Sequence, residues 1–377
     1  MDTLTLVDST SVPDLPAPFW FVQFFKVLGF VLHLVPMNLW YAGIAVALVL
    51  WFRGGPHGQR FSSRLMNQMP VIVAFGINFG IVPLLFLQLA YNRIFYPATI
   101  LMAWYWLSII GLLIVAYYGV YYYAFGLRSG QLGLARRVAA WVACLMFLAI
   151  GFLFANAFSL TTNVAAWADL WKDHSVAGAA TGTALNLSDP TLGPRWLLML
   201  GLALGTTAAW SLVDAYWLGA SEGPGYQAWA QSFATRMFIL GGAWAYLSGA
   251  WYVLGTWSPE VRSAMFSFPW IVLTLLTIAA PALPAAWLLL RRQQMLTAAE
   301  ATLVALAQLG VLAINAISRQ VVQNLELVPV FKVAEVPVNT QWSPLLVFLL
   351  LFVAAVLVVA WMLWQVIKLE KNTEPTA

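Results

Sequence analysis

The sequence predicts an all-α integral membrane protein with nine transmembrane helices in a single domain covering residues 1–377. Of the 377 residues, 62% are hydrophobic and only 8% are charged. The mean hydropathy of +0.82 is far above that of a soluble domain with a polar surface. Apolar stretches of about 20 residues, the length that spans the hydrocarbon core of a bilayer, recur along the whole chain. We therefore expect lipid around the protein and no nucleic acid among its partners.

Nine apolar segments are the expected helices, and short loops join them. They lie near residues 20–52, 70–92, 98–126, 138–160, 195–218, 232–256, 264–290, 299–324 and 343–367. Several exceed the minimum length, so tilt or an interfacial extension is expected. In the first segment, residues 20–26, which end in Lys26, are expected to lie along the lipid headgroups. The residues before them are acidic and do not resemble a cleaved signal peptide, so the first helix stays on the protein.

The charges of the loops orient the helices. Basic residues follow the first, third, seventh and ninth segments: Arg53, Arg60, Arg64, Arg128, Arg136, Arg137, Arg291, Arg292, Lys368 and Lys371. The opposite loops are mainly acidic: Asp169, Asp173, Asp189, Glu260, Glu326 and Glu335. Because basic loops stay in the cytoplasm, we expect the N-terminus outside and the C-terminus inside. Residues 161–194 then form the one sizeable extramembrane segment, an outer loop.

His33 lies deep in the first apolar segment and is the main candidate for chemistry. A charged group at this depth costs roughly 2.5 kcal/mol or more, so the imidazole must be bound to a metal, or neutral and hydrogen-bonded. Gly29 flanks its helical face and would let a flat ring such as a haem approach the backbone. From these residues alone, ligation of haem iron and a neutral imidazole bonded to a neighbouring helix both stay open. His57 and His174 lie in loops and are expected to be solvated.

Polar residues at the end of the eighth segment are a second candidate site. Arg319 and Gln320 stand at the centre of this cluster. The arginine could clamp a propionate or a phosphate in bidentate geometry, or it could pair with Glu326 as an interfacial anchor. A comparable polar edge belongs to the second segment and consists of Asn78, Gln88, Asn92 and Arg93.

Acids and cysteines are scarce in the apolar segments. No Asp or Glu occurs between Asp14 and Asp169, so the first four helices have no carboxylate for proton transfer or metal binding. Asp214, in the fifth segment, could relay protons, pair with Arg236 or extend to the inner interface. The single Cys144 excludes a disulfide framework, a covalent c-type haem and an iron–sulfur cluster.

The order of these motifs resembles subunit I of the cytochrome bd quinol oxidases. That family has nine spans with the N-terminus outside. Its first helix carries a haem-ligating histidine followed by Pro and Gly, its second carries G-I-N-F-x-x-G and then Q-F-G-T-N-W, and a late helix carries G-R-Q-P-W. Similar residues here are His33-Leu34-Val35-Pro36 with Gly43, Gly76-Ile77-Asn78-Phe79, Gln88-Leu89-Ala90-Tyr91-Asn92-Arg93 and Ser318-Arg319-Gln320. The resemblance implies a multi-pass protein of a prokaryotic inner membrane, with His33 as axial haem ligand and Arg319 as propionate partner.

Several functional residues of that family are absent here. Its glutamates on helix 3 are missing from residues 99–113, its late glutamate ligand falls on Ala316, and residues 194–201 offer no histidine for its low-spin haem. The quinol-binding outer loop has shrunk to a few residues around Pro259, and Met265 lies near where the family has a haem methionine. Since oxygen reduction needs proton-carrying acids, a quinol site and more than one haem, we expect none by this chain.

The sequence therefore predicts a membrane subunit of a respiratory-type electron-transfer complex. It would act as a scaffold or anchor with at most one b-type haem, whose iron His33 would bind. Gly29, Arg319 and Gln320 complete the expected cofactor site. Expected partners are other membrane subunits, lipid and a periplasmic cytochrome c that docks on residues 161–194.

Two other functions stay open. A membrane transporter or channel would line its path with polar residues such as Asn78, Asp214 and Arg319, although no internal repeat is evident. A haem-free membrane anchor would bind a quinone by stacking it on the aromatic runs at 104–106 and 117–118, which are equally suited to helix or lipid contacts.

Overall fold

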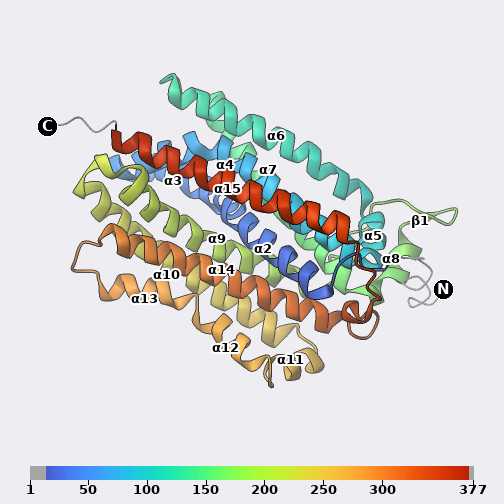
Figure 1. The fold of residues 1–377 in the computed structure, drawn as a ribbon. Helices are drawn as coiled ribbons and strands as arrows, with labels where there is room; N and C mark the ends of the chain where they lie inside the picture. Colours follow the sequence, from blue (N-terminus) through green and yellow to red (C-terminus); the bar gives the residue numbers. More distant parts are fainter. Residues whose placement is uncertain (1–13, 373–377) are drawn as a thin grey trace.

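Long helices dominate the computed structural model, which describes residues 14–372 (Figure 1). Eight helices are long and apolar enough to cross a membrane, and there are nine spans if one bent pair of helices counts as a further span. The chain is therefore a mainly helical, multi-pass membrane protein, as its composition predicts.

The N-terminal half contains four of these long spans and an ordered connection within residues 161–194. Its elements are α2 (Phe19–Asn38), the π-helical η1 (Leu39–Gly43), α3 (Ile44–Arg53), α4 (Gly55–Ala90), α5 (Asn92–Leu101), α6 (Ala103–Arg128), α7 (Leu134–Thr162), the 3₁₀-helical η2 (Val164–Ala166), α8 (Trp167–Asp173), β1 (Ser175–Val176) and β2 (Ala179–Ala180). The segment 161–194 is thus not a plain loop: α8 is followed by an antiparallel hairpin that pairs Ser175 with Ala180.

The C-terminal half contains the remaining spans. Its elements are α9 (Leu192–Val213), the π-helical η3 (Asp214–Leu218), the 3₁₀-helical η4 (Ala220–Glu222), α10 (Pro224–Gly255), α11 (Pro259–Met265), α12 (Ile271–Ala279), α13 (Ala282–Leu290), α14 (Ala298–Leu327), the 3₁₀-helical η5 (Val333–Glu335) and α15 (Trp342–Asn372). Figure 1 shows α2 beginning at the end of the bundle that carries α8 and β1, whereas α15 ends at the opposite end. We refer to the end with α8 and β1 as the outer end and to the opposite one as the inner end, as names for the two ends of the bundle.

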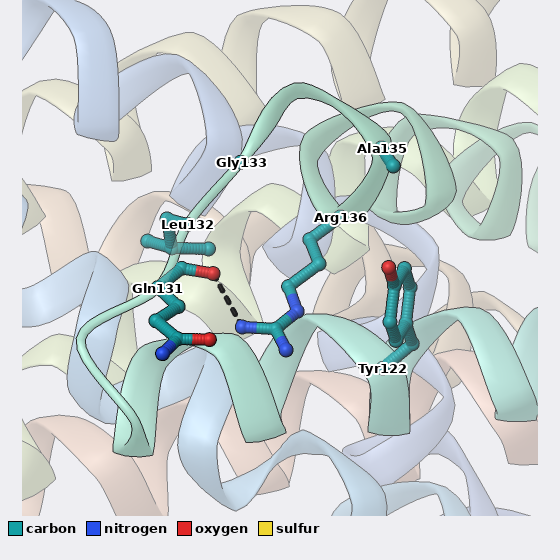
Figure 2. A pocket seen from close by; sticks show the side chains of 6 residues that line it. All are labelled: Tyr122, Gln131, Leu132, Gly133, Ala135 and Arg136. Atoms are coloured by element: carbon teal, nitrogen blue, oxygen red, sulfur yellow. Dashed lines mark hydrogen bonds between the residues drawn. The ribbon is translucent and has the colours of Figure 1, made fainter.

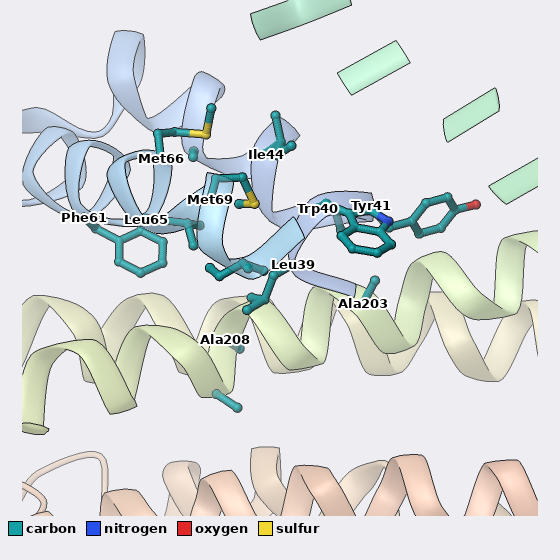
Figure 3. Packing of buried hydrophobic residues seen from close by; sticks show 14 of the residues in the cluster. Leu39, Trp40, Tyr41, Ile44, Phe61, Leu65, Met66, Met69, Ala203 and Ala208 are labelled. Carbon is teal, nitrogen blue, oxygen red and sulfur yellow. The ribbon is translucent and has the colours of Figure 1, made fainter. Parts of the chain in front are cut away.

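The first span, which runs from α2 through η1 to α3, lies at the centre of the bundle. Its α2 part contacts α4, α9 and α14, and its η1 part contacts α4, α7 and α9. Figure 3 shows part of the resulting core, in which Trp40 and Tyr41 of η1 lie on the same side of α9 as Leu65, Met66 and Met69 of α4. A wide π turn is an uncommon feature, and here it directs two large rings into the core.

Glycines on the neighbouring helices make room for the rings of the first span. A Cβ atom at Gly76 of α4 would overlap the ring of Trp40, and one at Gly151 of α7 would overlap the ring of Tyr41. Close approach at small residues is how helices associate in a membrane, because lipid removes the usual hydrophobic driving force. These glycines therefore fix the position of η1.

Helix α4 begins earlier than the predicted start at residue 70. Its first turns bury Phe61, Leu65 and Met69 at helical spacing and leave their other face exposed. Such an amphipathic stretch forms a stable helix once one face packs, but it contains too many polar residues to register as an apolar run. Pro56 also favours a helix start at this point, because its missing N–H costs nothing there.

Two predicted spans are broken. The segment 264–290 divides into α11, α12 and α13, and the last two are bent by 43° at Pro281, a residue that cannot donate a backbone hydrogen bond. The segment 98–126 divides into α5 and α6 at Met102. At this break the backbone oxygen of Leu101 accepts a hydrogen bond of 2.9 Å from the backbone N–H of Ala184, in the segment 161–194, in place of a bond within the helix.

Candidate functional site

The imidazole of His33 is held by α4. Its Nδ1 atom lies 2.8 Å from the backbone oxygen of Gly76. Because a carbonyl only accepts, Nδ1 carries the proton and Nε2 keeps its lone pair. Within residues 14–372, no hydrogen-bond partner of Nε2 is observed. The side chain thus makes the bond to a neighbouring helix that a neutral imidazole needs, while one ring nitrogen stays available.

A glycine also fixes the orientation of the His33 ring. A Cβ atom at Gly80, one turn beyond Gly76, would lie 2.8 Å from Cε1 of the imidazole. Trp40 closes the next side, with its ring 5.8 Å from the imidazole centroid in an edge-on arrangement. Gly76 and Gly80 therefore leave the space on α4 that the rings of Trp40 and His33 occupy. We call these two glycines the glycine seat.

Gly29 has a different neighbour. A Cβ atom at this position would lie 3.0 Å from both Val82 and Pro83 of α4. The small size of Gly29 thus permits close contact with α4 at Pro83, which lies inside that helix. The room expected here for a flat ring is taken by these two side chains.

Lys26 is buried, contrary to its predicted place at the headgroups. Only 8% of the residue is exposed. Its Nζ donates to the side-chain oxygens of Gln320 at 2.6 Å and Gln323 at 3.4 Å, both on α14, and it lies 4.0 Å from the ring centre of Tyr91. Sequence reasoning missed this residue because the α14 amides that draw it inward lie almost 300 positions away.

Neutral groups surround the Lys26 ammonium. The Nε2 of Gln320 donates to the Tyr91 hydroxyl at 2.8 Å, and Gln23 donates to the same oxygen at 2.9 Å. The hydroxyl in turn donates to Asn324. Both the oxygen and the nitrogen of the Gln320 amide, a predicted cofactor residue, are therefore already hydrogen-bonded within the protein. No carboxylate among the described residues neutralises Lys26.

Arg319 also lacks a carboxylate. Its guanidinium lies between the rings of Phe30 and Phe158, 4.9 and 4.8 Å from their centroids. The ion pair expected with Glu326 is not formed, because that carboxylate pairs with Arg195 of α9 at 2.6 Å. In the described part of the chain, Arg319 has no hydrogen-bond acceptor.

At this end of the bundle, three basic side chains share too few acidic partners. Among the described residues, the one acid that pairs with Lys26, Arg319 or Arg195 is Glu326, which binds Arg195. Burying an unpaired charge is costly, and such charges are normally paired with a counter-ion. This site, which we call the outer cation cluster, is suited to the carboxylates or phosphate of an anionic ligand.

His33 and Arg319 lie near each other in the bundle. Both are half-buried, as are Phe30 and Phe158. His33 lies one turn below Phe30 on α2, so the imidazole and the outer cation cluster adjoin the same part of the bundle.

The inner half contains the opposite arrangement. Asp214, at the start of η3, is 1% exposed and accepts two bonds of 3.0 Å from Nε of Arg64 and one of 2.6 Å from Tyr226. Glu222 pairs with Arg60. The predicted partner of Asp214 was therefore wrong, since Arg236 donates to Ser232 instead, and the carboxylate does not extend to the interface. We call Arg60, Arg64, Asp214, Glu222 and Tyr226 the inner ion-pair cluster.

The other predicted polar residues are dispersed. Asn78 is exposed on the outward surface of α4. His174 lies 3.3 Å from the hydroxyl of Thr183 in the outer loop, and His57 lies near the ring of Tyr226. Among residues 14–372, no group of three or more His, Cys, Asp or Glu side chains could hold a bare metal ion.

The surface of the protein also has shallow hollows. Figure 2 shows one beside the turn between α6 and α7, where Arg136 donates to the backbone oxygen of Gln131 and lies against Tyr122. These contacts close the connection between two helices, and the hollow is separate from the outer cation cluster.

Comparison with known proteins adds no relative. No protein-family model matches the chain, and no curated protein matches it. The resemblance to subunit I of the bd oxidases stays a prediction from the motifs.

Proposed function

We propose that the chain is a membrane subunit of a respiratory-type electron-transfer complex, similar to subunit I of the cytochrome bd oxidases. It acts as a scaffold and does not itself reduce oxygen. It crosses a prokaryotic inner membrane nine times, with the N-terminus outside and the C-terminus in the cytoplasm. It holds at most one b-type haem, bound through His33.

The observation that carries this proposal is the hydrogen bond from Nδ1 of His33 to Gly76 at 2.8 Å. Histidines that ligate a metal commonly donate their other ring N–H to a backbone carbonyl, which fixes the tautomer and the ring orientation. The remaining Nε2 has no partner within the described residues. Gly76 and Gly80 thus present the imidazole in the form that a haem iron needs.

The outer cation cluster fits the other end of such a group. Lys26 precedes His33 by seven residues, about 10 Å along the helix axis. A b-type haem has its carboxylates at one edge, and Lys26 and Arg319 would neutralise them there. When bound, the haem would supply one-electron transfer. The residues of this chain hold the imidazole, balance the buried charge and exclude water with the rings of Phe30 and Phe158.

Partners would surround this core. Other membrane subunits and lipid would cover the apolar helices, and a periplasmic cytochrome c would dock on residues 161–194, where Trp171 and Val176 are exposed. The transporter and quinone alternatives have less support than the haem proposal, because residues expected in their sites face away from the protein. Asn78 points away from the bundle, and Trp104 is 67% exposed toward its surroundings.

A reduced-minus-oxidised visible spectrum of the purified protein tests the proposal. We expect a Soret band that His33→Ala removes. His57→Ala and His174→Ala are matched controls, because they remove the other histidines of the chain and should leave the band unchanged. A wild-type protein without the band, or a band that survives His33→Ala, would contradict haem binding at this site.

The cation cluster gives a second, independent readout. Arg319→Met and Lys26→Met should each weaken haem retention, measured as the haem lost to apomyoglobin with time, while the band position stays that of a histidine-bound haem. Arg236→Met, which removes a cation from the opposite half of the bundle, should not change the loss rate.

A further inference from the structure

The outward face of α4 carries an amide at the middle of the membrane. Asn78 lies fourteen residues after Arg64 and fifteen before Arg93, with no charged residue between them. At about 1.5 Å per residue, each arginine is roughly 21 Å from Asn78 along the chain axis. Since the hydrocarbon core is about 30 Å thick, Asn78 lies near its midplane.

Asn78 faces away from the rest of the chain. Its neighbours on the same face are Val71, Phe75, Ile81 and Leu85, which are 57%, 46%, 48% and 57% exposed. The opposite face of α4 carries the glycines that seat Trp40 and His33. The amide therefore stands alone in an apolar stripe that the described residues do not cover.

Most of the hydrogen-bonding capacity of this amide is unused. Its Nδ2 donates to the backbone oxygen of Ala74, one turn earlier, at 2.8 Å. Its Oδ1 accepts no bond from the described residues. In hydrocarbon an unmet polar group costs several kcal/mol, so a second polypeptide that supplies a donor at this depth would be favoured over lipid.

The spacing of the stripe suits a partner helix. Positions 71, 75, 78, 81 and 85 follow one another at intervals of three or four, as in the seam of a left-handed helix pair. A single asparagine in such a seam sets its register. Helix α6 packs against α4 on one side, and on the other Phe348 of α15 contacts Phe86 near the outer end.

The chemistry of Asn78 favours one occupant. An amide is both a donor and an acceptor, so two copies of the same asparagine satisfy each other without any additional group. Copies in one membrane share an orientation, and a two-fold axis along the membrane normal brings each stripe residue against itself. We propose that α4 pairs with α4 of a second copy of this chain, and that Asn78 meets Asn78 on that axis.

Cysteine crosslinking in native membranes tests this pairing. Cys144 is buried and is the one cysteine of the chain, so Cys144→Ala supplies a clean background. Phe75→Cys and Ile81→Cys, which retain Asn78, should each give a disulfide-linked dimer on mild oxidation. Ile114→Cys on α6 and Leu247→Cys on α10, which are 52% and 75% exposed, are the controls and should stay monomeric.

Asn78 itself is tested in the same background. Asn78→Leu should lower the crosslinked fraction of Phe75→Cys about threefold to tenfold, the range expected for loss of an interhelical hydrogen bond in a membrane. Asn78→Gln keeps the amide and should restore much of it. Absence of dimer at positions 75 and 81, equal dimer at the control positions, or a crosslink to a different protein would each overturn the proposal.

Discussion

The two buried charged sites of this protein differ in how their charges balance. In the inner ion-pair cluster, Arg60 and Arg64 face Asp214 and Glu222. In the outer cation cluster, Lys26 has only amides and a ring as partners, and Arg319 has only rings. A balanced cluster is complete within the chain, whereas an unbalanced one is complete only with an anion from elsewhere. This difference separates a structural site from a candidate ligand site.

The largest effect is expected from breaking the inner cluster. Asp214→Asn removes the charge that Arg64 and Tyr226 share, and an orphaned ion in such a setting should lower the free energy of unfolding by about 3 kcal/mol. Thermal unfolding in detergent measures it. Arg60→Gln is the control: this arginine is 55% exposed, and its loss should cost below ~1 kcal/mol. Equal losses would remove the distinction between the buried and exposed members of the cluster.

The outer cluster should respond in the opposite direction. Without ligand, Arg319→Met removes an unpaired buried charge and should raise the free energy of unfolding by about 1–3 kcal/mol. The same unfolding assay on ligand-free protein measures the gain. A loss similar to that of Asp214→Asn would mean that Arg319 is balanced within the chain, and the contrast between the two halves would disappear.

The glycine seat on α4 sets the orientation of the His33 ring in the candidate site. Gly80→Ala places a methyl group 2.8 Å from the imidazole of His33, and such overpacking should cost about 1–3 kcal/mol and shift any haem band. Gly310→Ala is a matched control, because a Cβ atom there meets nothing within 4 Å. If both variants behave alike, the ring orientation is not set by Gly80.

The smallest effect concerns an exposed acid at the membrane edge. The pKa of Glu260 lies below its usual range because the carboxylate bonds its own backbone N–H and the Ser258 hydroxyl at the start of α11. A lowered folded-state pKa stabilises the helix above the unfolded value and loses that effect as the pH falls through the folded value. The protection factors of the amides in α11, which correct for the intrinsic exchange rate at each pH, should therefore fall below about pH 4. Glu260→Gln should remove this pH dependence and leave both buried clusters unaffected.

Much of the fold follows from hydropathy alone, since long apolar runs have few alternatives to spanning helices. The start of α4 and the break at Pro281 do not, because one depends on packing of an amphipathic face and the other on local backbone chemistry. The sites depend on distant pairings. Arg319 and Glu326 lie on one face of the same helix, two turns apart, yet Arg195 of a different helix binds the acid. Likewise, Asp214 and Arg64 are 150 residues apart.

The π turn η1 has a consequence for how such a protein evolves. A π turn arises when one residue is inserted into an α-helix, and each residue turns a helix by about 100°. His33 lies before η1 and the buried face of α3 lies after it. Deleting one residue from 39–43 would restore an ordinary helix but rotate the outer part of the first span against the inner part. An insertion or deletion here, more than any substitution, would separate the histidine from its glycine seat.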